Sequence, residues 1–239
     1  LNIICKDIID IKTYNVFPVY ENCGWIEMVE KSSTLYDIRH KYHTTLQNYI
    51  LDLNPNLTIR EMRSSFIKTC VSSCVLCYVM GVGDRHLENI LVTKDGKLLH
   101  IDFSYILGDD PKNLKVEMKI TEDMVNMLGG INSKYFKIFK KNCTLAYKKI
   151  RLRSSLWYVL LSYLEFSKPS IDVFKYTETV IKNHIIERLL PGENDKEASM
   201  QIIDIVDRSS KTSWSQNLAE FSHKISNTLR EATQFNIEL

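Results

Sequence analysis

The sequence predicts a mainly α-helical fold with a small β component, of the α+β class. Beyond residue 34, apolar side chains recur at the three- and four-residue spacing of helices that bury one face. Two pairs of short segments alternate apolar and polar residues around turn residues, as strands of hairpins do. With 239 residues and 44% hydrophobic content, the chain is long enough to bury a sizeable core.

The first pair of strands is expected near the start of the chain. Residues 11–19 alternate and are rich in β-formers, residues 21–24 read as a turn, and residues 25–29 form the second apolar run. Residues 1–11 form a short apolar opening. A break is expected at residues 31–33, before the helices begin.

Helices are expected over most of the remaining chain. Residues 34–49 have one apolar face, and Thr58 and Glu61 form a capping box at the start of a long buried helix. Later helices are predicted over residues 121–128, 135–150, 154–166, 171–189, 195–207 and 213–235.

The most informative stretch is residues 81–112, which read GVGDRHLENILVTKDGKLLHIDFSYILGDDPK. Asp95 and Gly96 lie between two apolar runs and predict a hairpin. A hairpin brings the residues before its first strand and after its second strand to the same end. We therefore expect four polar side chains to converge there: Asp84, His86, Asn89 and Asp102.

This set of side chains suits phosphoryl transfer, which depends on metal ions held by carboxylate and amide oxygens and on a group that takes a hydroxyl proton. Asp102 and Asn89 would be the metal ligands, and His86 with Asp84 would handle the proton. The alternative is separate structural roles, with Asp84 as a loop cap and Arg85 in a surface ion pair. A shared site is favoured because carboxylates brought close together need a cation. His100 is expected to be an ordinary half-buried strand histidine.

The order Asp-Arg-His-x-x-Asn followed by His-Ile-Asp-Phe resembles the catalytic and metal-binding loops of the phosphatidylinositol 3-/4-kinase superfamily. The block is most similar to the class III phosphatidylinositol 3-kinases, over residues 66–130. The resemblance implies a protein-kinase-like C-lobe with the N-lobe largely missing. Residues 1–30 would be the end of the N-lobe and the hinge. Residues 31–239 would be the helical C-lobe, with a catalytic hairpin at 81–103 and an activation loop at 104–120.

The resemblance also implies the roles of individual residues. ATP and Mg²⁺, with Mn²⁺ as an alternative, would be the cofactors. The catalytic residues would be Asp84, Arg85 and His86, with Arg85 bracing the loop, and the metal ligands would be Asn89 and Asp102. The adenine pocket would be lined by Tyr14, Glu27, Met28 and Val29, with Leu91 and Ile101 as its floor. Lys112 and Lys115 of the activation loop would face the substrate.

The implied reaction moves the ATP γ-phosphate to the 3-hydroxyl of phosphatidylinositol. Basic and acidic residues nearly balance in residues 104–120, which favours an unphosphorylated lipid over a phosphorylated one. The alternatives are a Ser/Thr protein kinase of the phosphatidylinositol-3-kinase-like group, a phosphatidylinositol 4-kinase, or an inactive pseudokinase or scaffold. Ser104 stands where the family motif has glycine, and no glycine-rich phosphate loop precedes Tyr14. A truncated chain that is inactive alone is therefore expected.

Composition restricts the partners and the compartment. A net charge of +2 provides no general field for polyanions, so no nucleic-acid partner is expected. Six cysteines without a signal peptide favour free thiols in a reducing compartment. Cys70, Cys74 and Cys77 could suggest zinc, but their helical spacing favours the core. We expect a cytoplasmic protein that is peripheral on membranes, with regulatory subunits as further candidate partners. The basic residues 134–153 and the last helix could contact lipid, although a solvated face and a core stripe are their more ordinary interpretations.

Overall fold

The computed structural model describes residues 7–20, 23–111, 117–166 and 176–211. Its helices are α2 Leu35–His40, α3 Leu46–Leu53, α4 Ile59–Met80, α5 Glu122–Met127, α6 Lys134–Arg151, α7 Ser154–Phe166 and α8 Glu178–Leu189, followed by a helix over residues 195–211. Its strands are β1 Val16–Tyr20, β2 Cys23–Ile26, β3 Ser32–Thr34, β4 Ile90–Thr93 and β5 Leu98–His100. The mainly α-helical class with a small β component is confirmed.

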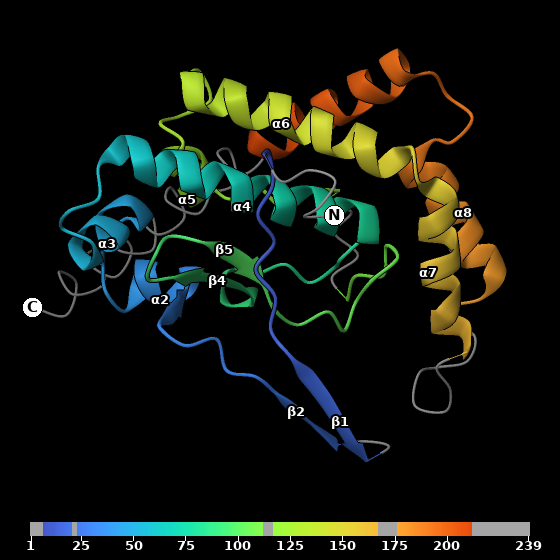
Figure 1. The fold of residues 1–239 in the computed structure, drawn as a ribbon, viewed down its shortest axis with the longest axis horizontal. Coiled ribbons are helices and arrows are strands. Elements are labelled where there is room, and N and C mark those ends of the chain that lie inside the picture. Colours follow the sequence, from blue (N-terminus) through green and yellow to red (C-terminus); the bar gives the residue numbers. More distant parts are fainter. Residues whose placement is uncertain (1–6, 21–22, 112–116, 167–175, 212–239) are drawn as a thin grey trace, which may run out of the picture.

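Helix α4 is the central element of the core, and α6, α8 and β5 pack against it (Figure 1). The predicted capping box opens it: the Thr58 hydroxyl accepts from the Glu61 backbone N–H, and the Glu61 carboxylate accepts from the Thr58 N–H. Helix α6 lies along its upper side, where Tyr78 and Tyr147 meet edge to face at 6.0 Å. The helix ends at Met80 and is capped by Gly81, whose φ of 58° is left-handed and suits glycine.

A three-stranded antiparallel sheet in the order β3–β4–β5 lies against the opposite side of α4. The predicted hairpin of β4 and β5 is present, with Leu91 opposite Leu99. It is fixed to α4 because Leu98 N donates to the Thr69 hydroxyl at 3.1 Å, and the Ser73 hydroxyl approaches the Leu98 carbonyl at 3.4 Å. These bonds hold the start of β5 against the middle of α4.

Strands β1 and β2 form a separate two-stranded sheet that projects from the body (Figure 1). Both of its faces are exposed, and the side chains of Phe17 and Trp25 are 55% and 72% accessible. The pairing of β1 with β2 was expected, but β1 begins at Val16 and not at residue 11. Instead, Asp10 is held at α4, since its N–H donates to the Lys68 carbonyl and its carbonyl accepts from the Ser72 hydroxyl.

Two other local predictions were wrong. Residues 34–49 are not one helix, because His43 takes a left-handed φ of 50° and the Thr45 hydroxyl caps the start of α3. Residues 32–34 are not a simple break, because they form β3 after Lys31 turns the chain with φ of 51°.

The predicted later helices are found with small shifts at their ends. Helix α8 begins at Glu178, capped by the Thr177 hydroxyl, and residues 167–175 lie outside the described part. The helix predicted at 195–207 continues to residue 211. The helix predicted over 213–235 and the opening residues 1–6 also lie outside it.

The cysteines in the described part are free thiols, with Cys70, Cys74, Cys77 and Cys143 buried and Cys23 exposed. The first three lie in the core face of α4, so the core interpretation is confirmed over the zinc interpretation. Within the described ranges, every helix is too short or too polar to cross a bilayer.

Candidate active site

The loop after α4 is held against the segment that follows β5. Met80 and Gly81 accept from the N–H groups of Leu107 and Gly108 at 2.8 and 2.9 Å, and Gly83 donates to the Tyr105 carbonyl at 2.9 Å. A Cβ atom at Gly83 would lie 2.1 Å from the Asp109 carbonyl oxygen. Glycine is therefore required at position 83 by close backbone packing.

Arg85 connects the two halves of the site. Its Nε donates to the Gly83 carbonyl at 2.8 Å, its Nη1 donates to the Ile101 carbonyl at 2.7 Å, and its Nη2 donates to the Asp102 carbonyl. One planar guanidinium thus joins the residues before the hairpin to the residues after it. The bracing contacts that the resemblance implied for Arg85 are present.

His86 lies between two carboxylates. Its Nε2 is 3.7 Å from Asp84 Oδ2, and its Nδ1 is 3.6 Å from Glu88 Oε2. These distances are too long for hydrogen bonds, as is common for catalytic pairs before a substrate tightens them. The sequence predicts Asp84 beside His86, whereas the contact of Glu88 with His86 is an addition from the structure. In the sequence, Glu88 is marked only by its position two residues after His86. The 3₁₀ turn Leu87–Asn89 is what brings the Glu88 side chain back to the His86 ring.

Asn89 occupies the buried side of the same end of the hairpin. Its side-chain amide donates to the Asp84 carbonyl at 2.9 Å, and its backbone carbonyl accepts from the Ile101 N–H at 3.1 Å. The amide N–H is therefore used inside the loop. The amide oxygen is the atom left for a cation.

Asp102 lies on the exposed side, two residues after the end of β5, with a left-handed φ of 58°. Its Oδ1 accepts from the Ser104 hydroxyl at 2.7 Å and from the Ser104 N–H at 3.1 Å. These bonds lower the pKa of the Asp102 carboxyl, with smaller contributions from the positive charges of Arg85 and His86. The carboxylate therefore lies within electrostatic reach of both residues and stays ionised at neutral pH.

The donor set of Asp102 and Asn89 fits a hard divalent cation. A carboxylate oxygen and an amide oxygen are the ligands that Mg²⁺ and Mn²⁺ prefer. Among the described residues, no group of three or more His, Cys, Asp or Glu side chains could hold a metal by itself. Such a sparse protein set suits a metal whose other ligands are phosphate oxygens and water.

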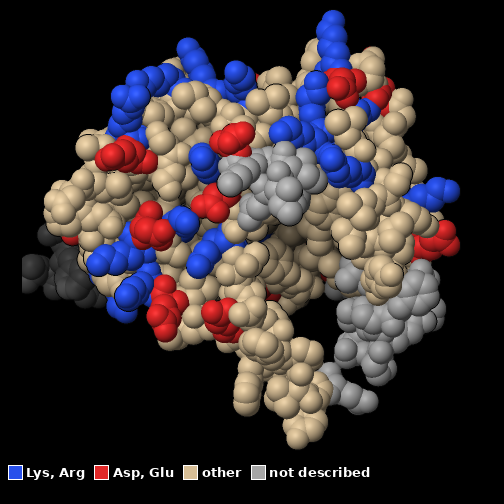
Figure 2. All heavy atoms as spheres, in the orientation of Figure 1, with Lys and Arg blue, Asp and Glu red and all other residues tan. Residues whose placement is uncertain are grey.

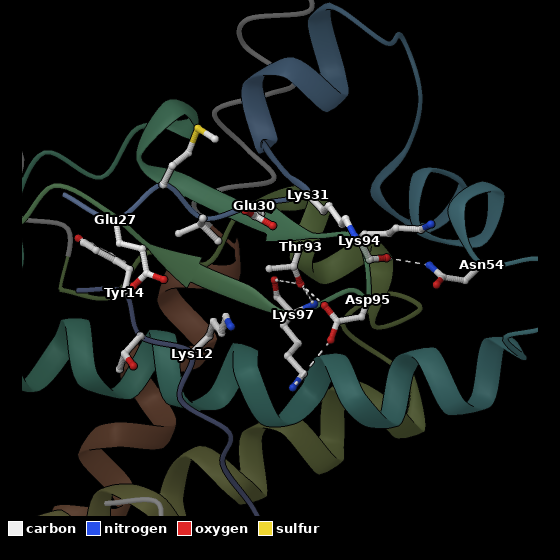
Figure 3. A pocket seen from close by; sticks show the side chains of 13 residues that line it. Lys12, Tyr14, Glu27, Glu30, Lys31, Asn54, Thr93, Lys94, Asp95 and Lys97 are labelled. Carbon is white, nitrogen blue, oxygen red and sulfur yellow. Dashed lines mark hydrogen bonds and ion pairs between the residues drawn. The ribbon is translucent and has the colours of Figure 1, made fainter. Parts of the chain in front are cut away.

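A cavity of about 750 Å³ lies beside the segment that joins β2 to β3 (Figure 3). Its lining includes all four residues predicted for the adenine pocket: Tyr14, Glu27, Met28 and Val29. Burial raises the pKa of Tyr14. Asp102 and Arg85 also shift this pKa, so the Tyr14 side chain lies near the end of the hairpin that carries Asp102. Tyr14 thus lies between this cavity and the polar site, whereas none of Asp84, His86, Asn89 and Asp102 lines the cavity.

The predicted floor residues, Leu91 and Ile101, do not line that cavity; residues of the β4–β5 turn do, including Thr93, Lys94 and Lys97. The register explains the shift. Ser32 pairs with Thr93, and Lys31 O accepts from Lys94 N at 2.7 Å, so the preceding residues lie alongside the turn. Figure 3 shows Lys31 and Lys94 together at one end and Tyr14 with Glu27 at the other.

Two further predictions concern residues outside this arrangement. His100 is fully buried and not half-buried, and burial together with the charge of Arg85 lowers its pKa to about 3. It is therefore a neutral side chain beneath the site. Lys112 and Lys115 lie outside the described residues, so their role in facing the substrate stays a prediction.

The fold and the site together define a class of protein. A helical lobe carries a hairpin whose ends gather a candidate acid–base pair and two candidate oxygen ligands, and a cavity lined by Tyr14 lies along the same hairpin. This is the organisation of the C-terminal lobe of kinases that transfer phosphoryl groups.

Comparison with known proteins identifies the family. Residues 2–165 match the family model described as phosphatidylinositol 3- and 4-kinase, so the chain belongs to this family and the resemblance is confirmed. Members of such a kinase family use ATP and a divalent metal. The division into residues 1–30 and 31–239 stays a prediction.

The chain is similar to phosphatidylinositol 3-kinases from several organisms. It is 31% identical to the phosphatidylinositol 3-kinase pik3 of Schizosaccharomyces pombe over 78% of this chain and 27% of that protein. It is 35% identical to the phosphatidylinositol 3-kinase VPS34 of Arabidopsis thaliana over 60% of this chain and 18% of that protein. It is 36% identical to the phosphatidylinositol 3-kinase VPS34 of Saccharomyces cerevisiae over 68% of this chain and 19% of that protein. The match thus spans at most about a quarter of these relatives.

Proposed function

We propose that the full-length protein carrying this chain transfers the γ-phosphate of ATP to the 3-hydroxyl of phosphatidylinositol. The observation that carries the proposal is the meeting of Asp84, His86, Asn89 and Asp102 at one end of the β4–β5 hairpin, in a chain similar to enzymes named phosphatidylinositol 3-kinase. The metal is Mg²⁺, with Mn²⁺ as an alternative, and it would be held by Asp102 and Asn89. When bound, it neutralises the charge of the transferring phosphates.

The proton of the inositol hydroxyl is taken by His86. Histidine is the side chain that most often serves as a general base in enzymes. Asp84 and Glu88, each within 4 Å of one ring nitrogen, stabilise the imidazolium that forms. Arg85 does not touch the reacting atoms in this scheme. It fixes the positions of Asp84 and Asp102 relative to each other through the backbone.

The nucleotide base occupies the cavity lined by Tyr14, Glu27, Met28 and Val29. Backbone groups of the segment between β2 and β3 are suited to bind the base, since this segment forms one wall of the cavity. The Tyr14 side chain closes the wall nearest to Asp102. The nucleotide phosphates then lie between the base pocket and the metal ligands.

The substrate lies in a membrane, so the protein is proposed to be cytoplasmic and peripheral on lipid bilayers, with regulatory subunits as further partners. The basic residues of α6 provide a candidate contact. Lys140, Lys148 and Arg151 are engaged in ion pairs with Asp207 or Asp195, whereas Lys134, Lys137 and Lys141 are exposed. Figure 2 shows Lys and Arg side chains gathered along the edge where α6 lies.

A side-by-side kinase assay tests the function. The full-length protein is offered phosphatidylinositol vesicles and a serine-containing peptide with labelled ATP, and the phosphate position on the inositol is determined. We expect label in phosphatidylinositol 3-phosphate, no label in the peptide, and no transfer by the folded Asp102→Ala variant. Label in the peptide or at the 4-hydroxyl would favour the rival kinases. Absence of any transfer, or unchanged activity in Asp102→Ala, would overturn the mechanism.

A further inference from the structure

Ser104 occupies the position that is glycine in the family motif, and the structure shows what the serine does there. The left-handed conformation in this segment belongs to Asp102, with φ of 58°, while Ser104 is not among the residues with positive φ. Ser104 therefore needs none of the backbone freedom of glycine. The substitution costs no strain and adds a hydroxyl group next to the proposed metal ligand.

The hydroxyl of Ser104 acts on one oxygen of Asp102. Both the hydroxyl and the N–H of Ser104 donate to Asp102 Oδ1, at 2.7 and 3.1 Å. Both bonds link residues two positions apart in the same exposed turn. Two donors on one oxygen fix the side-chain torsion of the aspartate. Within the described residues, no hydrogen bond to Oδ2 is found, so this second oxygen is the one presented to a cation.

We propose that Ser104 is a positioning residue that fixes the Asp102 carboxylate for metal binding through Oδ2. The inference rests on the proposed role of Asp102 as a metal ligand. Carboxylates that bind metals are regularly oriented by a hydrogen bond to their other oxygen, and loss of such a partner typically weakens metal affinity by about 10–100-fold. With glycine at position 104, the backbone N–H would remain and the shorter bond from the hydroxyl would be lost.

The proposal is tested by metal affinity. The full-length protein is titrated with Mn²⁺ in the presence of a non-hydrolysable ATP analogue, and free Mn²⁺ is measured by electron paramagnetic resonance. We expect Ser104→Ala and Ser104→Gly to weaken Mn²⁺ binding by about tenfold or more. Ser104→Thr keeps the hydroxyl and should restore wild-type affinity. Ser155→Ala, at an exposed serine of α7, is the matched control.

A second readout separates positioning from a general loss of structure. The Ser104→Ala variant should require a higher Mg²⁺ concentration for half-maximal activity, while its rate at saturating Mg²⁺ and its thermal unfolding stay close to wild type. Unchanged or tighter Mn²⁺ binding in Ser104→Ala would overturn the proposal, since the hydroxyl would then be irrelevant or would compete with the metal. Absence of Mn²⁺ binding in the wild-type complex would also overturn it.

Failure of this inference is distinguishable from failure of the proposed function. If the protein binds Mn²⁺ and nucleotide but phosphorylates a peptide and not a lipid, the lipid-kinase function fails while the Ser104 comparison still stands. If the lipid product forms normally in every Ser104 variant with unchanged Mn²⁺ affinity, the function stands and the inference fails.

Discussion

Two aspartates of the site adopt a conformation that is uncommon for residues other than glycine. Asp84 and Asp102 have φ values of 48° and 58°, and each such residue costs on the order of 1–3 kcal/mol unless its surroundings hold it. Arg85 supplies that restraint, since it donates to the carbonyls of Gly83, Ile101 and Asp102 around both positions. In this conformation the Asp84 carboxylate lies 3.7 Å from His86 Nε2, and the Asp102 carboxylate lies within electrostatic reach of His86.

Replacement of Arg85 by lysine tests this restraint. Lysine keeps the positive charge but lacks the planar fork, so it cannot serve three carbonyls at once. We expect Arg85→Lys to lower the rate of phosphate transfer by at least about tenfold and the free energy of unfolding by about 1–3 kcal/mol. Enzyme assays and urea denaturation measure both effects. Arg60→Lys, at an exposed position in the first turn of α4, is the control. Wild-type activity in Arg85→Lys would contradict the role.

At the residue scale, the sequence predicted which side chains gather but not how they contact one another. Asp84, His86, Asn89 and Asp102 follow from the hairpin, because its ends must meet. The contact of Glu88 with His86 and the bonds of Ser104 to Asp102 depend on a single 3₁₀ turn and a single backbone torsion. Neither leaves a periodic signal in the sequence.

At the scale of elements, the predictions succeeded where several signals agreed. The capping box and long apolar stripe predicted α4, and the Asp-Gly turn between apolar runs predicted β4 and β5. The prediction failed at residues 34–49, because a helical apolar pattern persists through the break at His43. Strand β3 was missed since it is three residues long and is formed only by pairing with β4.

Close packing of the α4–β4 loop on the segment after β5 predicts that Gly83→Ala is damaging. The added Cβ would lie 2.1 Å from the Asp109 carbonyl, so residues 105–109 must move away from the catalytic loop. We expect a stability loss of about 1–3 kcal/mol and a larger relative loss of activity. Gly192→Ala is the matched control, because its Cβ would meet open space. Equal behaviour of the two variants in chemical denaturation and kinase assays would show that the contact is unimportant.

The docking of α8 on α4 predicts a dependence of stability on pH. The His184 ring nitrogen Nε2 lies 2.8 Å from the Val79 carbonyl oxygen. Burial lowers the pKa of His184 below its ordinary value of 6.5, the Val79 carbonyl raises it in part, and the neighbouring charges of Arg188 and Glu187 act in opposite directions. The folded state therefore resists protonation of this histidine more than the unfolded chain does.

The sign of the effect follows from this difference. Above pH 6.5 the contribution of the neutral His184 is fully present, and it is lost as the pH falls from 6.5 toward the lowered folded-state pKa. Over this interval each pH unit lowers the free energy of unfolding by at most about 1.4 kcal/mol, because one proton is involved. We expect the free energy of unfolding of His184→Gln to fall less steeply between pH 7.5 and 5.5 than that of wild type. Parallel curves from urea denaturation would contradict this assignment.

At the scale of the whole molecule, one core built on α4 and α6 supports the site on one side and exposes a basic edge on another. The fold class and the family could be predicted from the sequence, because the hairpin motif is both specific and correctly spaced. The sequence could not predict which lysines of residues 134–153 are exposed. That depends on Asp195 and Asp207, which approach α6 from a helix far along the chain.

The basic edge predicts how the protein binds membranes. Replacing Lys134, Lys137 and Lys141 together by glutamate should weaken binding of the full-length protein to phosphatidylserine vesicles, by about 1 kcal/mol for each lysine that lies near the surface. Vesicle sedimentation measures the change. Binding to neutral phosphatidylcholine vesicles is the control and should not change. A loss that is equal on both vesicle types would point to misfolding and not to charge.

The central claim is that Asp102 and Asn89 hold the metal of a bound nucleotide. The most direct test is a crystal structure of the full-length protein with Mn²⁺ and a non-hydrolysable ATP analogue, in which anomalous scattering locates the metal. We predict a peak within about 2–2.5 Å of an Asp102 carboxylate oxygen and the Asn89 amide oxygen, next to the nucleotide phosphates. A peak distant from both residues, with the nucleotide in place, would contradict the claim.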